Sequence, residues 1–454
     1  MSTFESGRRV HVVGVGGAGM SGLAILLSEM GAHVSGSDER DSPILQELRE
    51  RGVRTFVGHR AGNADGAEVM LWSPAVSSDN VEIVAAQRAG AEMVTRSKVL
   101  FELASQKRVI GLTGTHGKTT ATSMMVQAAL AAGRDDGWLL GAPVLGVGAN
   151  GHWGSGDVIV EVDESYGTFG ELQPYALGLL NVEADHLDHY GSLGVLEDAF
   201  SDLVTRTLGP VVAWGDDAGV ARVVDHSRRD VILVGASSAL PWHVTNVTLD
   251  RRRSSFDVRG PDLELGITLR VTGAHNVANA AVVAVLAHAL GIEANAIEAG
   301  LSNFVGAPRR YQFRGAWRGV DVYEDYAHLP GEITATIEAT HAAGYDNVAV
   351  VFQPHRFTRT ASLAEEFGEA FHGANHVVVT DIYGAGEANP KGVTGELVAD
   401  ALRRHDPLVR THYVAALLDV TELLEQIVTA SDVILVLGAG DVGSLIATLP
   451  GGLR

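Results

Sequence analysis

The stretch Gly111-Leu-Thr-Gly-Thr-His-Gly-Lys-Thr-Thr120 decides the fold of the central part of this chain. Residues 108–112 predict a short buried strand, and residues 119–132 predict a helix, because they hold no Pro or Gly and are followed by a glycine. A strand, a glycine loop, Lys-Thr and a helix in this order are typical of a phosphate-binding loop, in which backbone N–H groups and a helix N-terminus face the anion. Lys118 adds positive charge to such a loop, and Thr119 can hold magnesium.

The loop departs from the usual pattern G-x-x-x-x-G-K-[ST], because position 112 is Leu and only the shorter form that begins at Gly114 is present. An ordinary glycine turn that carries a surface lysine is therefore the alternative interpretation. Lysine is scarce in this chain, which holds only Lys98, Lys107, Lys118 and Lys391, so a lysine inside a glycine loop stands out.

The length of 454 residues suggests about three domains of ~150 residues each. A hydrophobic content of 46% indicates a globular chain. The formal net charge of -21 argues against a nucleic-acid partner, because phosphate backbones are bound by clustered Lys and Arg. The absence of cysteine excludes disulfides, thiolate nucleophiles and Cys-ligated zinc. The first residues lack the apolar segment of a signal peptide, and no long apolar run occurs, so we expect a soluble, cytoplasmic protein without membrane contact.

The N-terminal residues predict a βαβ unit. The apolar run 9–15 predicts a strand, Gly14-x-Gly16-x-x-Gly19 opens a helix over 20–30, and the next strand, 31–38, ends in Asp38. This spacing is the dinucleotide fingerprint, and a Rossmann oxidoreductase is the first function that it suggests. The fingerprint itself indicates only that a diphosphate lies on a helix N-terminus.

The alternation of strands and helices continues and divides the chain into three α/β segments, 1–106, 107–307 and 308–454. The polar run at 105–108 and the restart of the pattern near Pro308 give the two boundaries. We expect a mostly parallel sheet in each segment. The short β segments between residues 244 and 271 suit an antiparallel addition to the central sheet.

Acidic residues follow the next predicted strand of the central segment. Residues 158–162 predict this strand, with Glu161 and Asp163 on one face of it and Glu164 past its end. In a phosphate-loop domain, an acid at the end of a neighbouring parallel strand helps to hold magnesium. The acids therefore predict a metal role, against the alternative of an ordinary acidic strand end.

The strand after that is followed by the polar, ligand-capable run 181–190. Ligands bind at the carboxyl ends of parallel strands, so His186 is a candidate second metal ligand, with an ordinary loop histidine as the alternative. Further along, His275 and Asn279 are four residues apart at the start of a predicted helix and can contact one ligand from the same face. Asn276 could instead be the N-cap of that helix.

Two strands of the third segment also end in polar and charged residues. The strand at 347–352 is followed by Gln353-Pro-His355-Arg356-Phe-Thr-Arg359, and two arginines three residues apart can clamp a carboxylate or a phosphate. Asp325-Tyr-Ala-His328 follows the strand at 319–323 in the same way. Surface charge pairs would explain either cluster alone, but not the repetition of this pattern at strand after strand.

These motifs together resemble the Mur ligase family. The resemblance runs nearly end to end, and its motifs recur in order: Gly14-Val-Gly-Gly-Ala-Gly-Met-Ser-Gly22, Gly114-Thr-His-Gly-Lys-Thr-Thr120, Asp163-Glu-Ser165, Asn181-Val-Glu-Ala-Asp-His186, His275-Asn-Val-Ala-Asn279, Asp325-Tyr-Ala-His328 and Gln353-Pro-His-Arg-Phe-Thr-Arg359. The likeness is nearest to the branch that adds L-alanine. Residues 190–207 contain no lysine, so the carbamylated lysine that several relatives place on a second metal is absent, as in that branch.

The resemblance implies an α/β fold of three domains: a Rossmann-like domain for a UDP-sugar at 1–106, a central ATP-binding domain at 107–307 and a Rossmann-like domain for the amino acid at 308–454. The implied reaction is an ATP-dependent ligation of L-alanine to UDP-N-acetylmuramate in peptidoglycan precursor synthesis. ATP phosphorylates the lactyl carboxylate, and the amine then attacks the acyl phosphate. The implied cofactors are ATP and magnesium, and we expect a monomer or a weak homodimer.

The family pattern also implies roles for individual residues. Catalysis is assigned to Lys118, Glu161 and His186, and magnesium binding to Thr119, Glu161 and His186. The residues assigned to ATP are Gly114, Thr115, His116, Gly117, Lys118, Thr119, Thr120, His275, Asn276, Asn279, Arg310 and Asp325, the last of them near the ribose. Those assigned to the UDP-sugar are Gly16, Ala18, Gly19, Met20, Ser21, Asp38, His59 and Ser73, and those on the amino-acid side are His328, His355, Arg356 and Arg359.

Two positions depart from the family pattern near the implied active site. Tyr166 stands where the family has an acid, and Leu329 stands where it has a second histidine. These departures leave the acceptor and the turnover rate open, and they motivate a non-catalytic nucleotide-binding homologue as one alternative. A ligase that attaches a whole tripeptide to the same UDP-sugar is a second alternative. A nicotinamide-dependent dehydrogenase is a third, although it leaves Lys118 and the acidic strand ends unexplained.

Overall fold

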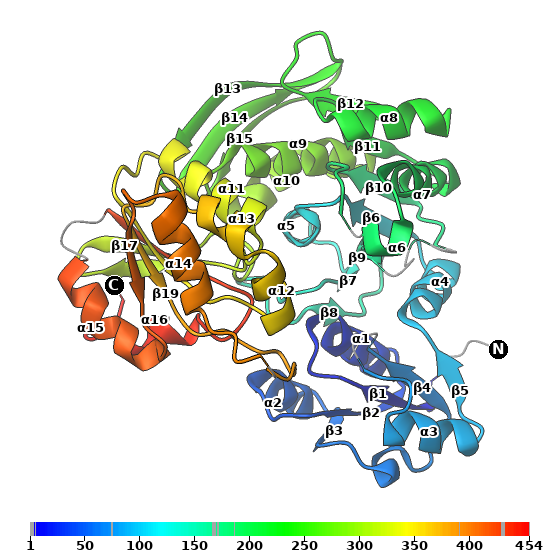
Figure 1. Cartoon of the computed structure of the whole chain (residues 1–454). Helices are drawn as coiled ribbons and strands as arrows, with labels where there is room; N and C mark the ends of the chain where they lie inside the picture. Colours follow the sequence, from blue (N-terminus) through cyan, green and yellow to red (C-terminus); the bar gives the residue numbers. More distant parts are fainter. Residues whose placement is uncertain are drawn as a thin grey trace. The chain divides into compact units, whose positions relative to one another are not determined.

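The computed structural model describes residue 4 and residues 6–73, 76–165, 169, 172–185, 187–389, 391–427 and 432–453, without the side chains of residues 18, 187 and 188. Within these residues the chain forms two compact units. The first unit comprises 1–248, 254–270 and 274–305, and the second comprises 249–253, 271–273 and 306–454. Each unit is built of helices packed on mostly parallel sheets, which confirms the predicted α/β fold class (Figure 1).

The first unit begins with a parallel sheet in the order β3-β2-β1-β4-β5. Its strands are β1 (Arg9–Val13), β2 (His33–Asp38), β3 (Arg54–Val57), β4 (Val69–Trp72) and β5 (Glu92–Val94). Its helices are α1 (Ala18–Glu29), α2 (Pro43–Glu50), the 3-10 helix η1 (Ala61–Ala64), α3 (Val81–Arg88) and α4 (Arg96–Gln106). The strand order reverses at β1, so the N-terminus of α1 lies at the switch point where open α/β sheets bind ligands.

A larger sheet in the same unit has the order β15-β14-β13-β12-β11-β10-β6-β9-β7-β8. Its strands are β6 (Val109–Thr113), β7 (Gly137–Leu139), β8 (Gly151–His152), β9 (Val158–Glu161), β10 (Ala176–Leu179), β11 (Val211–Trp214), β12 (Ile232–Gly235), β13 (Trp242–Asp250), β14 (Arg253–Arg259) and β15 (Glu264–Leu269). The central strands pair in parallel, whereas β14 and β15 pair antiparallel, as predicted for this segment. The sequence does not predict β7 and β8, because such short strands carry no readable periodicity.

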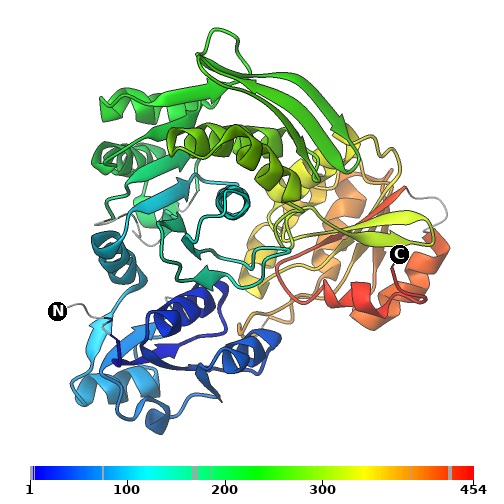
Figure 2. The ribbon, with the colours of Figure 1, turned by 180° about the vertical axis from the view of Figure 1, so that it is seen from behind.

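Helices cover both faces of this larger sheet. They are α5 (Lys118–Ala131), α6 (Leu187–Tyr190), α7 (Leu193–Arg206), α8 (Ala218–Ser227), α9 (Ala274–Ala289) and α10 (Ala294–Asn303). The helices α5, α9 and α10 pack on one another (Figures 1 and 2), and α9 covers the face of β10 that carries Gly178, where an added Cβ would lie 3.3 Å from Val282. Leu177 and Leu179 point to the opposite face and share a core with Phe200 of α7.

The second unit contains a sheet in the order β16-β17-β21-β18-β19-β20. Its strands are β16 (Gln312–Trp317), β17 (Val320–Asp325), β18 (Val348–Phe352), β19 (His376–Val379), β20 (Arg410–Tyr413) and β21 (Val433–Leu437). Its helices are α11 (Pro330–Ala342), α12 (Phe357–Ser362), α13 (Ala364–Glu369), α14 (Glu396–His405), α15 (Leu417–Ile427) and α16 (Ser444–Thr448). The strand β16 pairs antiparallel with β17, and the remaining pairs are parallel.

Alternate residues of these strands face two different helix layers. Val350 and Phe352 pack in a core with residues of α11, α13 and α14, whereas Ala349 and Val351 pack with residues of α15 and α16. Because both faces are buried, the strand sequence is a continuous apolar run instead of an alternating one. Since helices cover both faces of the sheet, polar residues can lie at the carboxyl ends of its strands.

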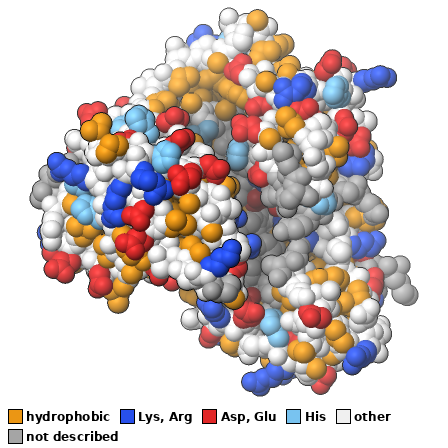
Figure 3. All heavy atoms as spheres, viewed as in Figure 1, with side chains coloured by type: hydrophobic (Ala, Val, Ile, Leu, Met, Phe, Trp, Pro, Cys, Tyr) orange, Lys and Arg blue, Asp and Glu red, His pale blue; other side chains and the backbone are white. Residues whose placement is uncertain are grey.

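Two further observations concern the charges on the surface and the length and polarity of the helices. On the face of the molecule shown in Figure 3, acidic and basic side chains are interspersed and do not separate by sign. Among the residues whose structure is described, no helix is long and apolar enough to cross a membrane.

The two sheets of the first unit are joined where α1 contacts β8. Gly22 and Gly151 allow the two backbones to approach closely, since a Cβ added to Gly151 would lie 2.1 Å from the carbonyl oxygen of Gly22. Beside this contact, Asn150 Nδ2 donates a hydrogen bond of 2.9 Å to Ser21 Oγ in the first turns of α1. The contact therefore fixes the N-terminus of α1 relative to the larger sheet.

We expect Gly151→Ala to destabilise the protein, because the new methyl group has no room without separating α1 from β8. Forced overpacking of this kind costs ~1–3 kcal/mol. Thermal unfolding compares this variant with Gly194→Ala, a control on α7 where an added Cβ meets nothing within 4 Å. A Gly151→Ala variant as stable as the control would contradict the close approach of the two backbones.

Candidate active site

The phosphate loop connects β6 to α5 and requires glycine for two reasons. The N-cap of α5 is Gly117, whose φ of 82° lies in the left-handed region that favours glycine. A Cβ at this position would also lie 2.8 Å from the side-chain amide of Asn279 on α9. The loop therefore holds the N-terminus of α5 open at the carboxyl end of β6, where its free N–H groups can bind an anion.

Lys118 is the centre of charge in this loop. Its Nζ donates to the carbonyl oxygens of Gly114 and Thr115, both at 2.9 Å, and to the two carboxylate oxygens of Glu164 at 2.9 and 2.8 Å. Asp163 Oδ1 lies 3.9 Å from the same Nζ. The Lys118 side chain is only 13% exposed, so the interpretation of an ordinary turn with a surface lysine is wrong.

Glu164 is a partner of Lys118 that the sequence does not predict. It is completely buried, and this burial raises the pKa of its carboxyl, although Lys118 opposes the rise. The run of acids at the end of β9 is the feature that could have indicated Glu164. The alternation of side chains along a strand, however, selects Glu161 and Asp163 and assigns no function to Glu164. The strand ends at Glu161, and the turn that follows brings Glu164 back to the loop.

Thr119 and Glu161 form a second contact between the loop and the acidic end of β9. Thr119 Oγ1 donates to Glu161 Oε1 at 2.9 Å, and Glu161 Oε2 accepts the N–H of Gly141 at 2.7 Å. A hydroxyl and a carboxylate are thus adjacent at the start of α5, and Mg²⁺ prefers such oxygen donors. Within the described ranges, no group of three or more His, Cys, Asp or Glu residues could hold a metal ion by itself.

Asn181 braces the other side of the loop. Its side chain accepts the N–H of His116 at 2.7 Å and donates to the carbonyl of His116 at 3.1 Å. Its own carbonyl accepts the N–H of Thr115 at 3.1 Å, and Thr115 Oγ1 accepts the N–H of Glu183 at 2.9 Å. The polar run after β10 therefore shapes the phosphate loop directly.

The residues predicted on α9 are placed beside the loop or on the helix surface. The helix begins at Ala274, so Asn276 lies inside it and the N-cap interpretation is wrong. Asn276 and Asn279 are buried, with Asn279 against Gly117, whereas His275 is exposed. The structure thus brings Asn279 to the loop.

Two predicted positions cannot be placed. His186 and Tyr166 lie outside the described residues.

The glycine turn after β1 is stabilised by an acid. Gly14 has a φ of 76°, and the N–H of Gly16 donates to Asp38 Oδ2 at 3.0 Å. A Cβ on Gly14 would lie 3.0 Å from Cβ of Ser73, so these predicted residues are close neighbours. Asp38 supports the turn itself, in addition to any contact with a nucleoside.

The first turns of α1 offer backbone groups more than side chains. The side chains of Met20 and Ser21 are 4% and 2% exposed, so they point into the protein. Gly19 lies against the guanidinium of Arg96, the first residue of α4. The side chain of Ala18 is not described.

A buried network behind His59 is not predicted by the sequence. Glu82 on α3 is completely buried. Its carboxylate is within hydrogen-bond distance of His11 Nε2 at 3.0 Å, Ser37 Oγ, the N–H of Arg60 at 2.9 Å and Asn63 Nδ2 at 2.7 Å, and its Oε1 lies 3.5 Å from His59 Nδ1. Burial acts to raise the pKa of Glu82, but these hydrogen bonds outweigh it and lower the pKa to about 2. His59 Nδ1 lies 3.2 Å from Ser37 Oγ, so Glu82 helps to position His59.

Glu82→Gln should destabilise the protein in a pH-dependent way. Because the pKa of Glu82 falls from its ordinary 4.5 to about 2 on folding, its charge stabilises the fold above pH 4.5, and this stabilisation is lost as the pH falls toward 2. We expect the variant to lose roughly 2–3 kcal/mol of unfolding free energy at neutral pH. The difference from the wild type should shrink below pH 4.5.

Urea unfolding at several pH values measures this difference. Glu39→Gln, which replaces an exposed acid of the same sheet region, is the control. A difference between Glu82→Gln and the wild type that stays constant with pH would contradict a charged Glu82.

In the second unit, predicted residues lie at the carboxyl end of β17 and directly after it. Asp325 accepts the N–H groups of Tyr311 and Ala327 at 2.5 and 2.7 Å, and burial raises the pKa of its carboxyl. The carboxylate of Glu332 caps α11 by accepting the N–H groups of His328 and Leu329 at 2.9 and 3.0 Å. The backbone N–H of Leu329, the residue that departs from the expected histidine, is therefore held by this cap.

The second cluster of this unit follows β18. The rings of His328 and His355 lie 5.7 Å apart, and His355 stacks on Tyr383. Burial, followed by the charges of His328, Arg359 and Arg356, lowers the pKa of His355 to about 4, so this histidine is neutral at pH 7. The exposed Arg356 and the half-buried Arg359 then supply the positive charge, as two donors for a carboxylate.

Arg310 contributes a further cation to this unit. It is exposed, and its guanidinium lies 5.3 Å from the ring centroid of Tyr326.

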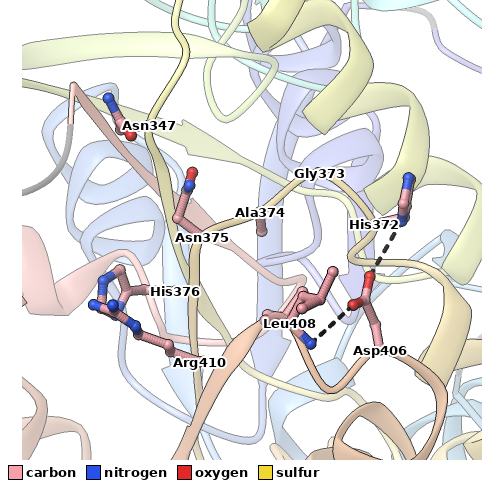
Figure 4. A pocket seen from close by; sticks show the side chains of 10 residues that line it. Asn347, His372, Gly373, Ala374, Asn375, His376, Asp406, Leu408 and Arg410 are labelled. Carbon is pink, nitrogen blue, oxygen red and sulfur yellow. Dashed lines mark hydrogen bonds and ion pairs between the residues drawn. The ribbon is translucent and has the colours of Figure 1, made fainter.

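An open cavity of about 500 Å³ in the second unit does not belong to these clusters. Figure 4 shows the side chains that line it, among them His372 bonded to Asp406, and His376 beside Arg410. They lie next to the amino ends of β18, β19 and β20, at the opposite edge of the sheet from Asp325 and His355. Since ligands of parallel sheets bind at the carboxyl ends, this cavity is not the predicted site.

Comparison with known families decides the identity of the chain. It matches the Mur ligase family, catalytic domain, at residues 9–108, the Mur ligase middle domain at 156–287 and the Mur ligase, glutamate ligase domain, at 309–440. The chain belongs to the Mur ligase family. The N-terminal glycine fingerprint is therefore that of an ATP-dependent, amide-forming ligase, and the dehydrogenase interpretation is wrong.

Curated relatives and solved structures of this Mur ligase cover nearly the whole chain. It is 39% identical over 439 residues to UDP-N-acetylmuramate–L-alanine ligase of Geobacter sp. (strain M21), covering 96% of this chain and 95% of that protein. It is 37% identical over 450 residues to the ligase of the same name from Sorangium cellulosum, covering 97% and 96%.

The solved UDP-N-acetylmuramate-alanine ligase of Thermotoga maritima matches with a TM-score of 0.82 and 28% identity, covering 96% of this chain and 97% of that one. A murein peptide ligase from Psychrobacter arcticus, at 21% identity and a TM-score of 0.69 over 99% of this chain and 100% of that one, shares the fold.

Proposed function

We propose that this protein joins L-alanine to UDP-N-acetylmuramate with hydrolysis of ATP, in the synthesis of peptidoglycan precursors. The observation that carries the proposal is the phosphate loop, in which Lys118 and Thr119 contact the acidic end of β9. The full-length similarity to ligases that are named for these substrates supports it. In this reaction the γ-phosphoryl group passes to the lactyl carboxylate, and the amine of L-alanine then displaces phosphate from the acyl phosphate.

Magnesium fits the residues beside the loop. Thr119 Oγ1 and Glu161 lie 2.9 Å apart, and Mg²⁺ usually takes one or two protein carboxylates together with substrate phosphates, so a three-acid cage is not required. We infer that Thr119 and Glu161 hold the ion, with His186 proposed from the family pattern. When bound, Mg²⁺ neutralises charge on the phosphate oxygens.

The residues of the loop position the phosphoryl group and stabilise its charge. The N–H groups at the start of α5 bind phosphate oxygens. Lys118 exchanges part of its hydrogen bonding to Glu164 for hydrogen bonds to these oxygens. Asn181 and Asn279 keep the loop in shape from both sides. Phosphoryl transfer depends mainly on such positioning and electrostatics, since the protein forms no bond to the phosphorus.

The glycine turn before α1 is proposed to bind the diphosphate of the UDP-sugar. Gly16 and Gly19 supply the N-terminal turn, and Asp38, Ser73 and His59 line the nucleoside side. Of these, Asp38 already bonds to Gly16, and His59 is held near Ser37. This arrangement suits a diphosphate on a helix N-terminus, the same chemistry that the phosphate loop uses for ATP.

The clusters after β17 and β18 are proposed to contact ATP and the amino acid. Asp325 and Arg310 are assigned to ATP, and His328, His355, Arg356 and Arg359 to L-alanine. Because His355 is neutral, the positive charges of the neighbouring Arg356 and Arg359 remain available to the alanine carboxylate. We also propose the three domains at 1–106, 107–307 and 308–454, a cytoplasmic location, and a monomer or weak homodimer.

Lys118→Ala should reduce ligation strongly and lower the stability, because Glu164 loses its cation, while the secondary structure is retained. Loss of one preorganised charge contact in such a site reduces kcat by ~10²–10³-fold, and here ATP binding weakens as well. The measurement is phosphate release with UDP-N-acetylmuramate, ATP and L-alanine, beside circular dichroism. Lys391→Ala, which removes an exposed lysine, is the control. Unchanged activity of Lys118→Ala would refute the phosphate-loop assignment.

Assays with different acceptors distinguish the proposed function from its alternatives. We expect phosphate release to depend on both UDP-N-acetylmuramate and L-alanine, with the tripeptide much poorer as an acceptor. Activity with the tripeptide alone would assign the protein to tripeptide attachment instead. Binding of ATP without release of phosphate, whichever acceptor is added, would indicate a non-catalytic homologue.

A further inference from the structure

Arg96, the first residue of α4, lies on the first turn of α1. The three atoms nearest to a Cβ built on Gly19 all belong to its guanidinium, with Nη1 at 3.1 Å and Cζ at 3.5 Å. In a dinucleotide fingerprint the third glycine usually allows a helix to pack on a strand. Here the glycine makes room for a planar cation at the helix N-terminus.

The two helix N-termini next to Arg96 are unfavourable neighbours for a cation. Arg96 occupies the first position of α4, after the N-cap Thr95, and its guanidinium also faces the N-terminal turn of α1. Both helix ends carry partial positive charge, and a cation at either end is unfavourable. An anion between the two helix ends and the guanidinium would reverse the sign of all these interactions.

The guanidinium also has an unused donor. Arg96 Nε is buried and has no hydrogen-bond partner among the residues that the structure describes. A buried donor without a partner is unfavourable, and such groups in native structures need an explanation. An oxyanion seated on the first turn of α1 would supply the acceptor.

The location of Arg96 connects the two anion sites of the first unit. Asp163 lies 3.9 Å from Lys118 Nζ in the phosphate loop. The charge of Arg96 acts on this same carboxylate, so Arg96 is within electrostatic reach of the phosphate loop while it contacts the first turn of α1.

We propose that Arg96 binds an oxyanion of the UDP-sugar substrate at the first turn of α1, either a diphosphate oxygen or the lactyl carboxylate. A guanidinium suits both groups, because its fork of N–H donors matches two oxygens at once. The proposal rests on the proposed function, since it takes UDP-N-acetylmuramate as the substrate. It makes Arg96 a substrate-binding residue next to Gly19.

Equilibrium binding without turnover tests this role. Calorimetry measures the dissociation constants of UDP-N-acetylmuramate, UDP-N-acetylglucosamine and ATP for the wild type, Arg96→Ala, Arg96→Lys and Lys98→Ala. UDP-N-acetylglucosamine carries the same diphosphate but no lactyl carboxylate. Lys98 is a matched control, because it is a cation of the same helix turn that pairs with Glu102 at 3.9 Å instead of facing α1.

We expect Arg96→Ala to weaken binding of UDP-N-acetylmuramate by about 10- to 100-fold, the loss of one charge-assisted contact. ATP affinity should stay unchanged, and Arg96→Lys should recover part of the loss. The melting temperature of Arg96→Ala should stay equal or rise, because a cation leaves the positive end of α4. A purely structural role for Arg96 would instead lower it.

The two nucleotides identify the group that is bound. Weaker binding of both would support a diphosphate contact, and weaker binding of UDP-N-acetylmuramate alone would support a carboxylate contact. Unchanged affinity of Arg96→Ala for both would overturn the role of Arg96 and leave the proposed function intact. A wild type that binds neither nucleotide would overturn the proposed function and this inference with it.

Discussion

The contact between the ammonium of Lys118 and the buried carboxylate of Glu164 holds the phosphate loop in its shape. The same ammonium is bonded to two carbonyl oxygens of the loop, so one cation ties the strand end of β9 to the turn before α5. Removing either partner would leave an unpaired charge out of water, which is strongly unfavourable. When a nucleotide phosphate enters the loop, its oxygens replace carboxylate oxygens of Glu164 beside the ammonium of Lys118. The positive charge that binds the phosphate is therefore already in place.

The first unit repeats this arrangement at a second helix. Both α1 and α5 follow a buried parallel strand and a glycine turn, and both begin after an N-cap glycine that makes no side-chain capping hydrogen bond. The close approach of Gly22 and Gly151 fixes α1 to the larger sheet, and with it the two proposed anion sites. A substrate whose diphosphate binds one helix can then present another group to the phosphate bound at the other, which is what an acyl-phosphate ligation requires.

Several parts of the fold and of the candidate site are readable from the sequence. The strand, glycine loop and helix around Lys118, the βαβ unit that ends at Asp38 and the antiparallel pair β14–β15 follow from periodicity and glycine placement alone. Glu164, Glu82 and Arg96 are different. In its local sequence each looks like an ordinary charged residue. Its role depends on partners that are distant in the sequence, such as Gly19 for Arg96 and His11 for Glu82.

The sequence by itself determined the α/β class, the phosphate loop and the Mur ligase family, because these depend on residue spacings within a few turns of chain. Only the tertiary structure decided which acid holds Lys118, since Glu164 is 46 residues away and reaches the loop through the parallel pairing of β6 and β9. It also decided that Asn276 lies inside α9 and that Gly19 accommodates a guanidinium. Burial and pairing at such separations come from packing, which no local pattern encodes.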